Sequence, residues 1–458
     1  MTSSVVLVSN RGPVSFREVD GQLVGTRGGG GLVSGLAPLV AGRDTTWVAA
    51  ALSDGDRAAA ADGVIEAAGM RVRTLAIDDA ILRPAYDVVC NATLWFMYHG
   101  LFDLSRRPIY DTSWDDAWAA FRSYNQQFAD VIATDTAANA TVLVQDYHLC
   151  LLGPMLRSSR PDLTTVHFSH TPFAPPMMMK ALPTAAAHEL LEGMAGHDVC
   201  GFHSARWAKD YQDSCLNVLG HEVPTFVSPL APDPDDIGAV AASPRCVEAY
   251  HELDEHVGDR QLIVRVDRIE LSKNLLRGFR AFDRLLRDRP DLRERVVFRS
   301  LGYPSREGLP EYLAYRQEVE ALVDVINRRW QTSEWTPIEL DFRDDFPRSV
   351  AHLCRYDVLY INPIRDGLNL VAKEGPIVNT NNGTLVLSRE AGIHDELEGA
   401  CLSVNPYDIA EQARALGEAL DRTAAQRATA SAELRRRALL RTPKDWMAEQ
   451  LAAASAGR

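Results

Sequence analysis

The sequence predicts an α/β protein made of two doubly wound domains, each with a parallel sheet covered by helices on both faces. Two observations support this prediction. Short apolar runs alternate with longer segments whose apolar residues recur every three or four positions, a pattern typical of strands that alternate with helices. The chain also has 458 residues. One hydrophobic core rarely serves a chain of this length, so two domains of about 200 residues each are expected.

The predicted strands are short, mainly apolar runs, as expected for parallel strands buried on both faces. They are VVLVSN (5–10), TVLVQD (141–146), TTVHFSH (164–170), DVCGFHS (198–204), QLIVRVD (261–267), RVVFRS (295–300), DVLYINP (357–363) and TLVLSR (384–389). Amphipathic helices are predicted between the strands, for example over 113–133 and 310–330.

A stretch rich in Pro, Asp and Ser, residues 228–245, has the composition of an interdomain connection. We therefore predict an N-terminal domain over 1–235 and a C-terminal domain over 236–425. The alanine-rich segment 423–440 is predicted to be helical. Residues 426–458 are accordingly predicted to form helices that pack across the join between the domains.

Charge and cysteine content exclude several classes of protein. The net charge of −14 argues against nucleic acid as the main partner. The seven cysteines form no CxxC pair, which predicts small buried side chains in a reducing compartment. The first residues have no basic start, and no apolar run approaches the roughly 20 residues of a membrane span. These features predict a cytoplasmic protein without membrane contacts.

Nearly every predicted strand is followed by polar residues. Ligands of doubly wound sheets bind beyond the carboxyl ends of the strands, so this pattern favours a binding protein or enzyme over a structural protein. Any single one of these residues could equally cap a helix or form a surface pair. They are Asn10–Arg11, Asp146–His148, His170, His203, Asp267–Arg268, Ser305–Arg306, Arg365–Asp366 and Arg389–Glu390.

Two cations in the segment RVDRIELSKN suit a diphosphate. Arg268 and Lys273 flank a loop directly after a predicted strand. The alternative is a solvated loop that pairs with nearby acids. Only five of the 48 basic residues are lysines, so a lysine at this position favours a functional role.

The stretch NPIRDGLNLVAKEGP, residues 362–376, is predicted to be a strand end, a turn and the start of a helix near Asn369. The free N–H groups of a helix N-terminus favour a phosphate. Asp366 and Glu374 can accept hydrogen bonds from sugar and ribose hydroxyls. The alternative is that Asp366 caps the helix and Glu374 lies on the surface.

Four consecutive glycines, Gly28 to Gly31, follow the first strand and a short hairpin-like insertion. Their backbone could approach an anion closely, although a flexible turn explains a glycine run equally well. The acidic pairs Asp78–Asp79 and Asp344–Asp345 have no metal-ligand spacing, and we interpret them as turn or capping residues. No metal site is predicted.

Together these motifs resemble the trehalose-6-phosphate synthases, which are retaining glucosyltransferases of the GT-B fold. The resemblance runs from residue 5 to about 445. It rests, in the family's order, on VSNR, GGGGL, NATLW, QDYHL, FSHTPFAP, GFHS, VDRIELSKN, PSRE, NPIRDGLNLVAKE, VLSREAG and VNPYD. It implies two Rossmann-like domains facing a central cleft.

The resemblance also implies roles for single residues. The catalytic set would be Arg268, Lys273, Asp366, His170 and Asp146. A nucleotide-glucose donor would be bound by Gly30, Gly31, Arg268, Lys273, Asp366, Gly367, Leu368, Asn369, Leu370, Val371 and Glu374. The acceptor, glucose 6-phosphate, would contact Arg11, Tyr86, Trp95, Asp146 and Arg306.

Three positions depart from the family's pattern. Trp47 matches the first tryptophan of a WxGW stretch near the acceptor, but alanine stands near Ala50 in place of the second. The loop DYSKG reads ELSKN here. Pro376 stands where the family's helix usually continues, so that helix should kink or end early.

The resemblance implies front-face attack, in which the leaving diphosphate accepts the proton of the acceptor. Arg268 and Lys273 would stabilise the charge on the leaving group, so neither a metal nor another cofactor is expected. UDP-glucose and GDP-glucose both remain open as donors, and a homo-oligomer is left open. Two other interpretations compete. One is a related (pseudo)glycosyltransferase of secondary metabolism with a different phosphorylated sugar or cyclitol acceptor. The other is a sensor of sugar nucleotides without catalysis.

Overall fold

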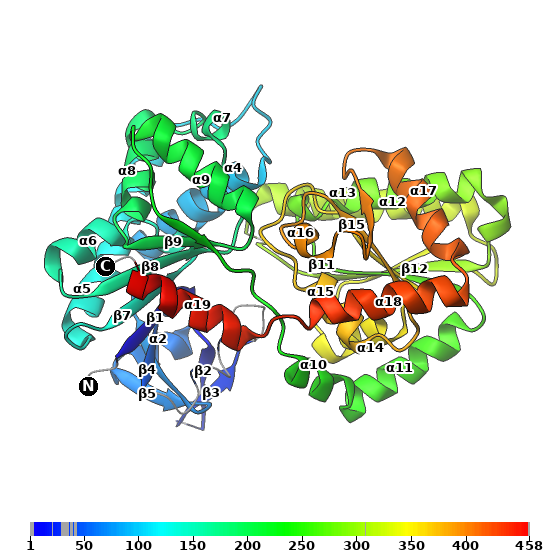
Figure 1. Ribbon diagram of the computed structural model, residues 1–458, viewed down its shortest axis with the longest axis horizontal. Coiled ribbons are helices and arrows are strands. Elements are labelled where there is room, and N and C mark those ends of the chain that lie inside the picture. Colours follow the sequence, from blue (N-terminus) through cyan, green and yellow to red (C-terminus); the bar gives the residue numbers. More distant parts are fainter. Residues whose placement is uncertain are drawn as a thin grey trace. The chain divides into compact units, whose positions relative to one another are not determined.

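The computed structural model describes residues 4–20, 22–28, 36, 40, 44–306 and 308–456 (Figure 1). The chain forms two compact units. The first contains 1–230 and 443–458, and the second contains 231–442. The chain therefore enters the second unit five residues before the boundary expected from the sequence, and it returns to the first unit for its last helix.

The sheet of the first unit has eight strands in the order β10-β9-β8-β7-β1-β4-β6-β5. All neighbours pair in parallel except β5 and β6, which are antiparallel. A separate hairpin, β2 and β3, follows β1. The strands are β1 (Val5–Arg11), β2 (Val14–Val19), β3 (Gln22–Arg27), β4 (Thr45–Ala50), β5 (Val64–Ala67), β6 (Met70–Leu75), β7 (Thr141–Gln145), β8 (Thr164–Ser169), β9 (Val199–Phe202) and β10 (Thr225–Val227).

Helices of the first unit follow most of its strands. They are α2 (Asp54–Ala60), α3 (Asp79–Arg83), the π-helix η1 (Pro84–Leu94), α4 (Trp95–His99), α5 (Thr112–Asp135), the 3₁₀ turn η2 (Tyr147–Leu149), α6 (Leu152–Ser159), α7 (Pro176–Met179), α8 (Thr184–Ala195), α9 (Ala205–Val218) and α19 (Pro443–Ala456). Figure 1 shows α19, in red, among these elements, and it packs against β7, β8 and β9.

The second unit has a six-stranded sheet in the order β13-β12-β11-β14-β15-β16, and every neighbouring pair is parallel. The strands are β11 (Gln261–Arg268), β12 (Val296–Tyr303), β13 (Ile338–Asp341), β14 (Val358–Ile361), β15 (Thr384–Ser388) and β16 (Leu402–Val404). The helices are α10 (Pro234–Ala241), α11 (Pro244–Val257), η3 (Leu271–Lys273), α12 (Leu275–Asp288), η4 (Pro290–Leu292), α13 (Pro310–Trp330), α14 (Phe346–Arg355), α15 (Val371–Val378), α16 (His394–Leu397), α17 (Ile409–Asp421) and α18 (Ala424–Ala438).

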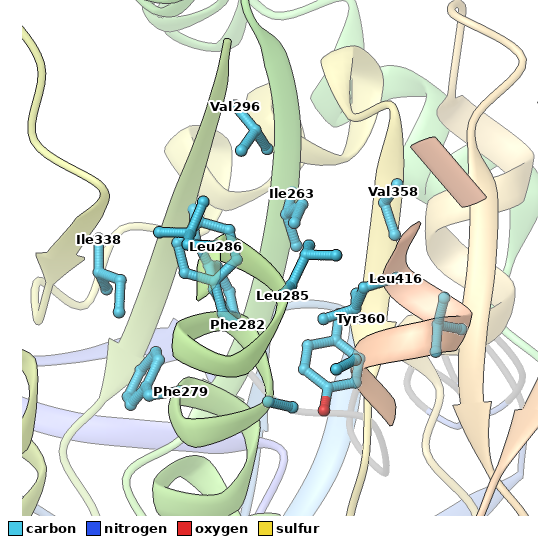
Figure 2. Packing of buried hydrophobic residues seen from close by; sticks show 14 of the residues in the cluster. Ile263, Phe279, Phe282, Leu285, Leu286, Val296, Ile338, Val358, Tyr360 and Leu416 are labelled. Atoms are coloured by element: carbon cyan, nitrogen blue, oxygen red, sulfur yellow. The ribbon is translucent and has the colours of Figure 1, made fainter. Parts of the chain in front are cut away.

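Helix α12 shows how the second unit buries its core. Its apolar residues recur at helical spacing, so one face carries Phe279, Phe282 and Leu286 while the other face is polar. Figure 2 shows this face directed at side chains from the sheet, including Ile263. The ring of Phe282 lies 5.4 Å from that of Phe298 on β12. The core fixes α12 against the sheet and thereby positions the loop between β11 and α12.

The structure confirms the predicted α/β class and forms all eight predicted strands. It also contains six unpredicted strands outside the hairpin: β4, β5, β6, β10, β13 and β16. The predicted connection 228–245 is only partly irregular, because α10 forms within it. All seven cysteines are free and buried, as predicted.

One smaller prediction is confirmed, because the side chains of Asp78 and Asp345 cap α3 and α14. Within the described residues, no helix is both long and apolar enough to cross a membrane.

Candidate functional site

The structure brings Lys273 and Asp366 together in the second unit. Lys273 ends the short turn η3 after β11, and Asp366 lies in the loop after β14. The Nζ atom of Lys273 is 2.6 Å from Oδ2 of Asp366. Asn369 donates to the same oxygen from Nδ2 at 3.0 Å. Three predicted site residues therefore meet beyond the carboxyl ends of two adjacent strands, where ligands of such sheets bind.

The loop that carries Asp366 is held by its backbone. The amide of Asp366 donates to the carbonyl of Glu390, and the amide of Gly392 donates to the carbonyl of Asp366, both at 3.0 Å. Asn369 has a positive φ of 85°, which turns the chain before helix α15. That helix starts at Val371, two residues after the predicted start, and ends two residues after Pro376.

A buried carboxylate, Glu270, lies next to this pair and gathers two arginines. Its Oε1 is 3.1 Å from Nη1 of Arg268 and 2.6 Å from Nη1 of Arg306, and Ser305 donates to it at 2.6 Å. Burial alone would raise the pKa of Glu270. The nearby cations, Arg268 before Arg306 and Lys273, outweigh burial and lower the pKa to about 2. Glu270 was not among the residues predicted from the sequence.

Arg306 was predicted to contact the acceptor together with Arg11, Tyr86 and Trp95. The structure places Arg306 in the second unit, directly after β12, whereas the other three lie in the first unit. Arg306 shares Glu270 with Arg268, so within its own unit it belongs to the cluster around Lys273. Its role toward an acceptor stays a prediction.

Glu374 is half-buried on α15. Among the described residues, its carboxylate has no hydrogen-bond partner and no ion pair. Burial raises the pKa of Glu374 to about 7. No group of the described residues donates a hydrogen bond to this carboxylate, so its oxygens remain available to accept hydrogen bonds from a ligand.

In the first unit, Asp146 and His170 lie at the ends of neighbouring strands. Asp146 follows β7 with a positive φ of 72°, a strained conformation for a residue other than glycine. Its Oδ1 accepts a hydrogen bond from the backbone amide of His170 at 3.2 Å. This contact fixes the two strand ends together.

A chain of hydrogen bonds fixes the tautomer of His170. The backbone amide of Leu230 can only donate, and it lies 3.3 Å from Nδ1 of His203. Neutral His203 therefore carries its proton on Nε2 and donates it to Nδ1 of His170 at 3.0 Å. His170 in turn donates from Nε2 to Oε1 of Gln145 at 3.0 Å.

Both ring nitrogens of His170 are thus engaged within the first unit. Burial, followed by His203 and His167, holds the pKa of His170 well below its usual value. The chain of hydrogen bonds ends on α19, where Gln450 accepts from Gln145 at 3.3 Å. His170 is accordingly held neutral and fixed in orientation. This suits a residue that contacts a ligand in a fixed geometry better than one that exchanges protons with it.

The predicted acceptor residues of the first unit lie on different elements, and the rings of Tyr147 and His148, directly after Asp146, contact Trp95 and Tyr86. Arg11 is exposed at the end of β1. Tyr86 lies in the π-helix η1 and stacks on His148 at 5.7 Å. Trp95 is buried in α4 and stacks on His99 at 3.8 Å. π-Helices are rare in proteins, and those that occur often lie at functional sites.

The region with the altered tryptophan pattern belongs to the core. Trp47 is fully buried in β4, and its Nε1 donates to Oγ of Ser9 at 2.7 Å. Ala50 ends the same strand and is also buried. Trp47 therefore supports β1 just before Arg11. Gly30 and Gly31, predicted donor residues, lie outside the described residues.

Comparison with known proteins finds relatives that match nearly the whole chain. The sequence model of the family described as Glycosyltransferase family 20 matches residues 3–456. A trehalose-6-phosphate synthase from Mycobacterium sp. (strain KMS) is 31% identical over 472 residues, covering 97% of this chain and 93% of that protein. A bifunctional trehalose-6-phosphate synthase/phosphatase from Thermoproteus tenax is 31% identical over 77% of this chain, which spans 49% of that protein.

The structure is also similar to a solved one. It superposes with a TM-score of 0.85 on a UDP-forming α,α-trehalose-phosphate synthase from Burkholderia xenovorans in complex with glucose-6-phosphate. The two are 27% identical, and the match covers 98% of this chain and 99% of that one.

Proposed function

This chain belongs to glycosyltransferase family 20, and on that basis we propose that it transfers glucose, with retention, from a nucleotide-glucose to glucose 6-phosphate. The product would be trehalose 6-phosphate. The predicted fold is confirmed, since both units are Rossmann-like and solved enzymes of the family share the GT-B architecture. The observation that carries the proposal is the cluster of Lys273, Asp366 and Arg268 beyond the strands of the second unit.

The chemistry of that cluster suits a nucleotide-glucose donor. Arg268 and Lys273 supply positive charge for the diphosphate, and their effect is largest when the bond to glucose breaks and the leaving group gains charge. Asp366 accepts hydrogen bonds from glucose hydroxyls, with the backbone from Gly367 to Val371 beside it. Glu374 accepts from the ribose diol.

We propose that the leaving phosphate oxygen takes the proton of the acceptor hydroxyl as the new glycosidic bond forms on the same face. This route needs no side-chain base, in agreement with the fixed, neutral His170. It also needs no metal, because Arg268 and Lys273 stabilise the departing diphosphate. By the resemblance to the family, Asp146 and His170 of the first unit would contact glucose and the acceptor.

UDP-glucose is the donor to test first. The Burkholderia xenovorans neighbour is described as UDP-forming and was solved with glucose-6-phosphate. GDP-glucose remains the alternative. The buried Ala50 at the end of β4, where the family has an aromatic residue, favours one competing possibility, a different phosphorylated sugar or cyclitol as acceptor.

A matrix of donors and acceptors tests the proposal. UDP-glucose and GDP-glucose would each be combined with glucose, glucose 6-phosphate and phosphorylated cyclitols, with and without EDTA, and products scored by mass. We expect trehalose 6-phosphate from one donor with glucose 6-phosphate, unaffected by EDTA. A product from another phosphorylated acceptor alone would support the altered acceptor. A bound donor that never turns over would support the sensor.

We expect Arg11→Ala to raise the KM for glucose 6-phosphate by about tenfold or more, because an arginine fork to a phosphate is a charge-assisted bond. Donor affinity should stay unchanged. Steady-state kinetics with each substrate varied in turn would measure both effects. Arg17→Ala, an exposed arginine on the nearby hairpin, is the matched control. Equal wild-type rates with glucose and glucose 6-phosphate would contradict the phosphate contact.

For Glu374→Gln, we expect opposite effects on binding and stability. Losing a charged acceptor for the ribose should weaken nucleotide binding by about 1–2 kcal/mol. The folded-state pKa of Glu374, about 7, lies above the usual 4.5, so the wild type loses stability as pH rises from about 4.5 through 7. Glutamine does not ionise. The variant should therefore melt at a higher temperature than the wild type at pH 8 but not at pH 4.

Calorimetry with the free nucleotide and melting curves at both pH values would check these effects. Glu318→Gln on the exposed face of α13 is the isosteric control and should change neither. Unaltered nucleotide affinity in Glu374→Gln would show that Glu374 does not bind the ribose.

A further inference from the structure

An arginine lies fully buried inside β11, the strand that leads to the site. Arg265 has no exposed surface, and a charge in such a position is costly unless it is paired. Its Nη1 donates to Oδ1 of Asn362 at 2.6 Å, and its Nη2 donates to the backbone carbonyl of Lys273. Its Nε lies 2.9 Å from Oδ2 of Asp267. Arg265 therefore contacts the main chain of Lys273 and a second acid close to it.

That second acid competes with Asp366 for Lys273. Asp267 is buried, and its Oδ1 is 3.9 Å from Nζ of Lys273, whereas Oδ2 of Asp366 is at 2.6 Å. Burial raises the pKa of Asp267, and the charges of Arg265 and Lys273 oppose that rise. Without Arg265, the carboxylate of Asp267 would have Lys273 as its only nearby cation among the described residues.

We propose that Arg265 is a positioning residue that neutralises Asp267 and holds the backbone of Lys273, so that the ammonium group stays directed at Asp366 and available to a diphosphate. The inference rests on the proposed function for the identity of the ligand, but not for the arrangement itself.

The surroundings of Arg265 are built to hold it in one place. A Cβ atom on Gly278 of α12 would lie 2.8 Å from Nη1 of Arg265, so glycine there makes room for the guanidinium. Asn362, its partner, donates to Oε1 of Gln412 at 2.8 Å. Asn274, next to Lys273, donates to the carbonyls of Asn362 and Pro406 at 2.9 and 2.8 Å. These bonds tie the loop of Lys273 to the loop of Asp366.

The test compares Arg265→Met with the double variant Arg265→Met/Asp267→Asn. If Arg265 only fills space and bonds carbonyls, the second change should not help. If it neutralises Asp267, removing the charge of Asp267 as well should restore nucleotide affinity and the acylation rate of Lys273. Arg160→Met is the matched control, because Arg160 likewise combines hydrogen bonds to backbone carbonyls with an aspartate partner, Asp162, but lies in the first unit.

Two readouts separate this inference from the proposed function. The first is the affinity for UDP and for GDP, measured by calorimetry. The second is the rate at which acetic anhydride acylates Lys273, mapped by mass spectrometry. With five lysines in the chain, Lys209, which is exposed on α9, provides an internal reference. Only the neutral amine reacts, so the rate reports how tightly the surrounding charges hold its proton.

In Arg265→Met we expect nucleotide affinity to fall about tenfold or more and acylation of Lys273 to slow several-fold, because the unneutralised Asp267 binds the ammonium group. The double variant should return both to within about threefold of the wild type. Arg160→Met should melt at a lower temperature with both readouts unchanged. A double variant as impaired as Arg265→Met, or an Arg265→Met indistinguishable from the wild type, would overturn the inference.

If Arg265→Met does not fold, Arg265→Lys decides, because lysine keeps a positive charge beside Asp267 but lacks the donors of the guanidinium group. Acylation of Lys273 should then stay within about threefold of the wild type, and a rate several-fold slower would overturn the inference. A wild type that binds neither UDP nor GDP would refute the proposed function, while the acylation experiment would still test the role of Arg265.

Discussion

Lys273→Ala is expected to reduce kcat about a hundredfold while the KM for the acceptor stays nearly constant. Charge on the leaving diphosphate is greatest in the transition state, so a cation at that position acts mainly on the rate, and one such contact contributes about 3 kcal/mol. In the structure Lys273 is directed at Asp366 at 2.6 Å and is held by its backbone. Steady-state kinetics with the acceptor varied at saturating donor would measure both constants. Arg268→Ala should act in the same direction.

Lys209→Ala is the control for Lys273→Ala, because Lys209 is an exposed lysine paired with Asp213 on α9. It should leave both kinetic constants unchanged. Normal turnover in Lys273→Ala and Arg268→Ala would show that the diphosphate is bound elsewhere. A rise in acceptor KM without a fall in kcat would instead assign Lys273 to the acceptor.

Glu270→Gln is expected to lower the free energy of unfolding of the second unit by about 3 kcal/mol at pH 7, because it leaves the largely buried Arg306 without its carboxylate. The folded-state pKa of Glu270, about 2, lies below the usual 4.5. Its contribution is therefore complete above about pH 4.5 and is lost as pH falls through 2. The difference between wild type and variant should shrink over that interval.

Urea unfolding of both proteins at pH 7, 5 and 3 would follow this difference. Glu339→Gln is the control, because Glu339 pairs with Arg299 and contacts His256, but is less buried than Glu270. Burial lowers the pKa of His256, so Glu339 has one cation at pH 7 where Glu270 has two. The change should therefore cost less at pH 7. A difference for Glu270→Gln that stays constant down to pH 3 would show that packing, not charge, makes Glu270 important.

The fold could be predicted from the sequence where strands are buried on both faces. Every residue of β8 and β15 is buried, and strands of this kind are mainly apolar in the sequence. The strands that escaped prediction lie mostly at sheet edges or have few residues, as β10 and β16 do with three each. β4 escaped for another reason: its threonines and alanines give a weak apolar pattern although the strand is fully buried.

The site could be predicted only in part. Lys273 and Asp366 follow strands that are adjacent in the sheet, so topology alone brings them together. Glu270 and Arg265 were missed because their function depends on partners distant in the sequence, Arg306 and Asn362. One signal was present in the sequence. An arginine inside the apolar run QLIVRVD would be buried, and a buried arginine requires polar partners.

The last helix has a consequence for the synthesis of the chain. α19 completes the first unit, where Trp446 lies against Phe168 with ring centroids 4.9 Å apart and Gln450 bonds Gln145. Yet the ribosome makes all of 231–442 before it reaches this helix. At about 5–20 residues per second, the nascent first unit waits on the order of ten to forty seconds with the surface over β8 uncovered. Over that interval it is a natural client for chaperones that shield apolar surface, and the second unit can fold first.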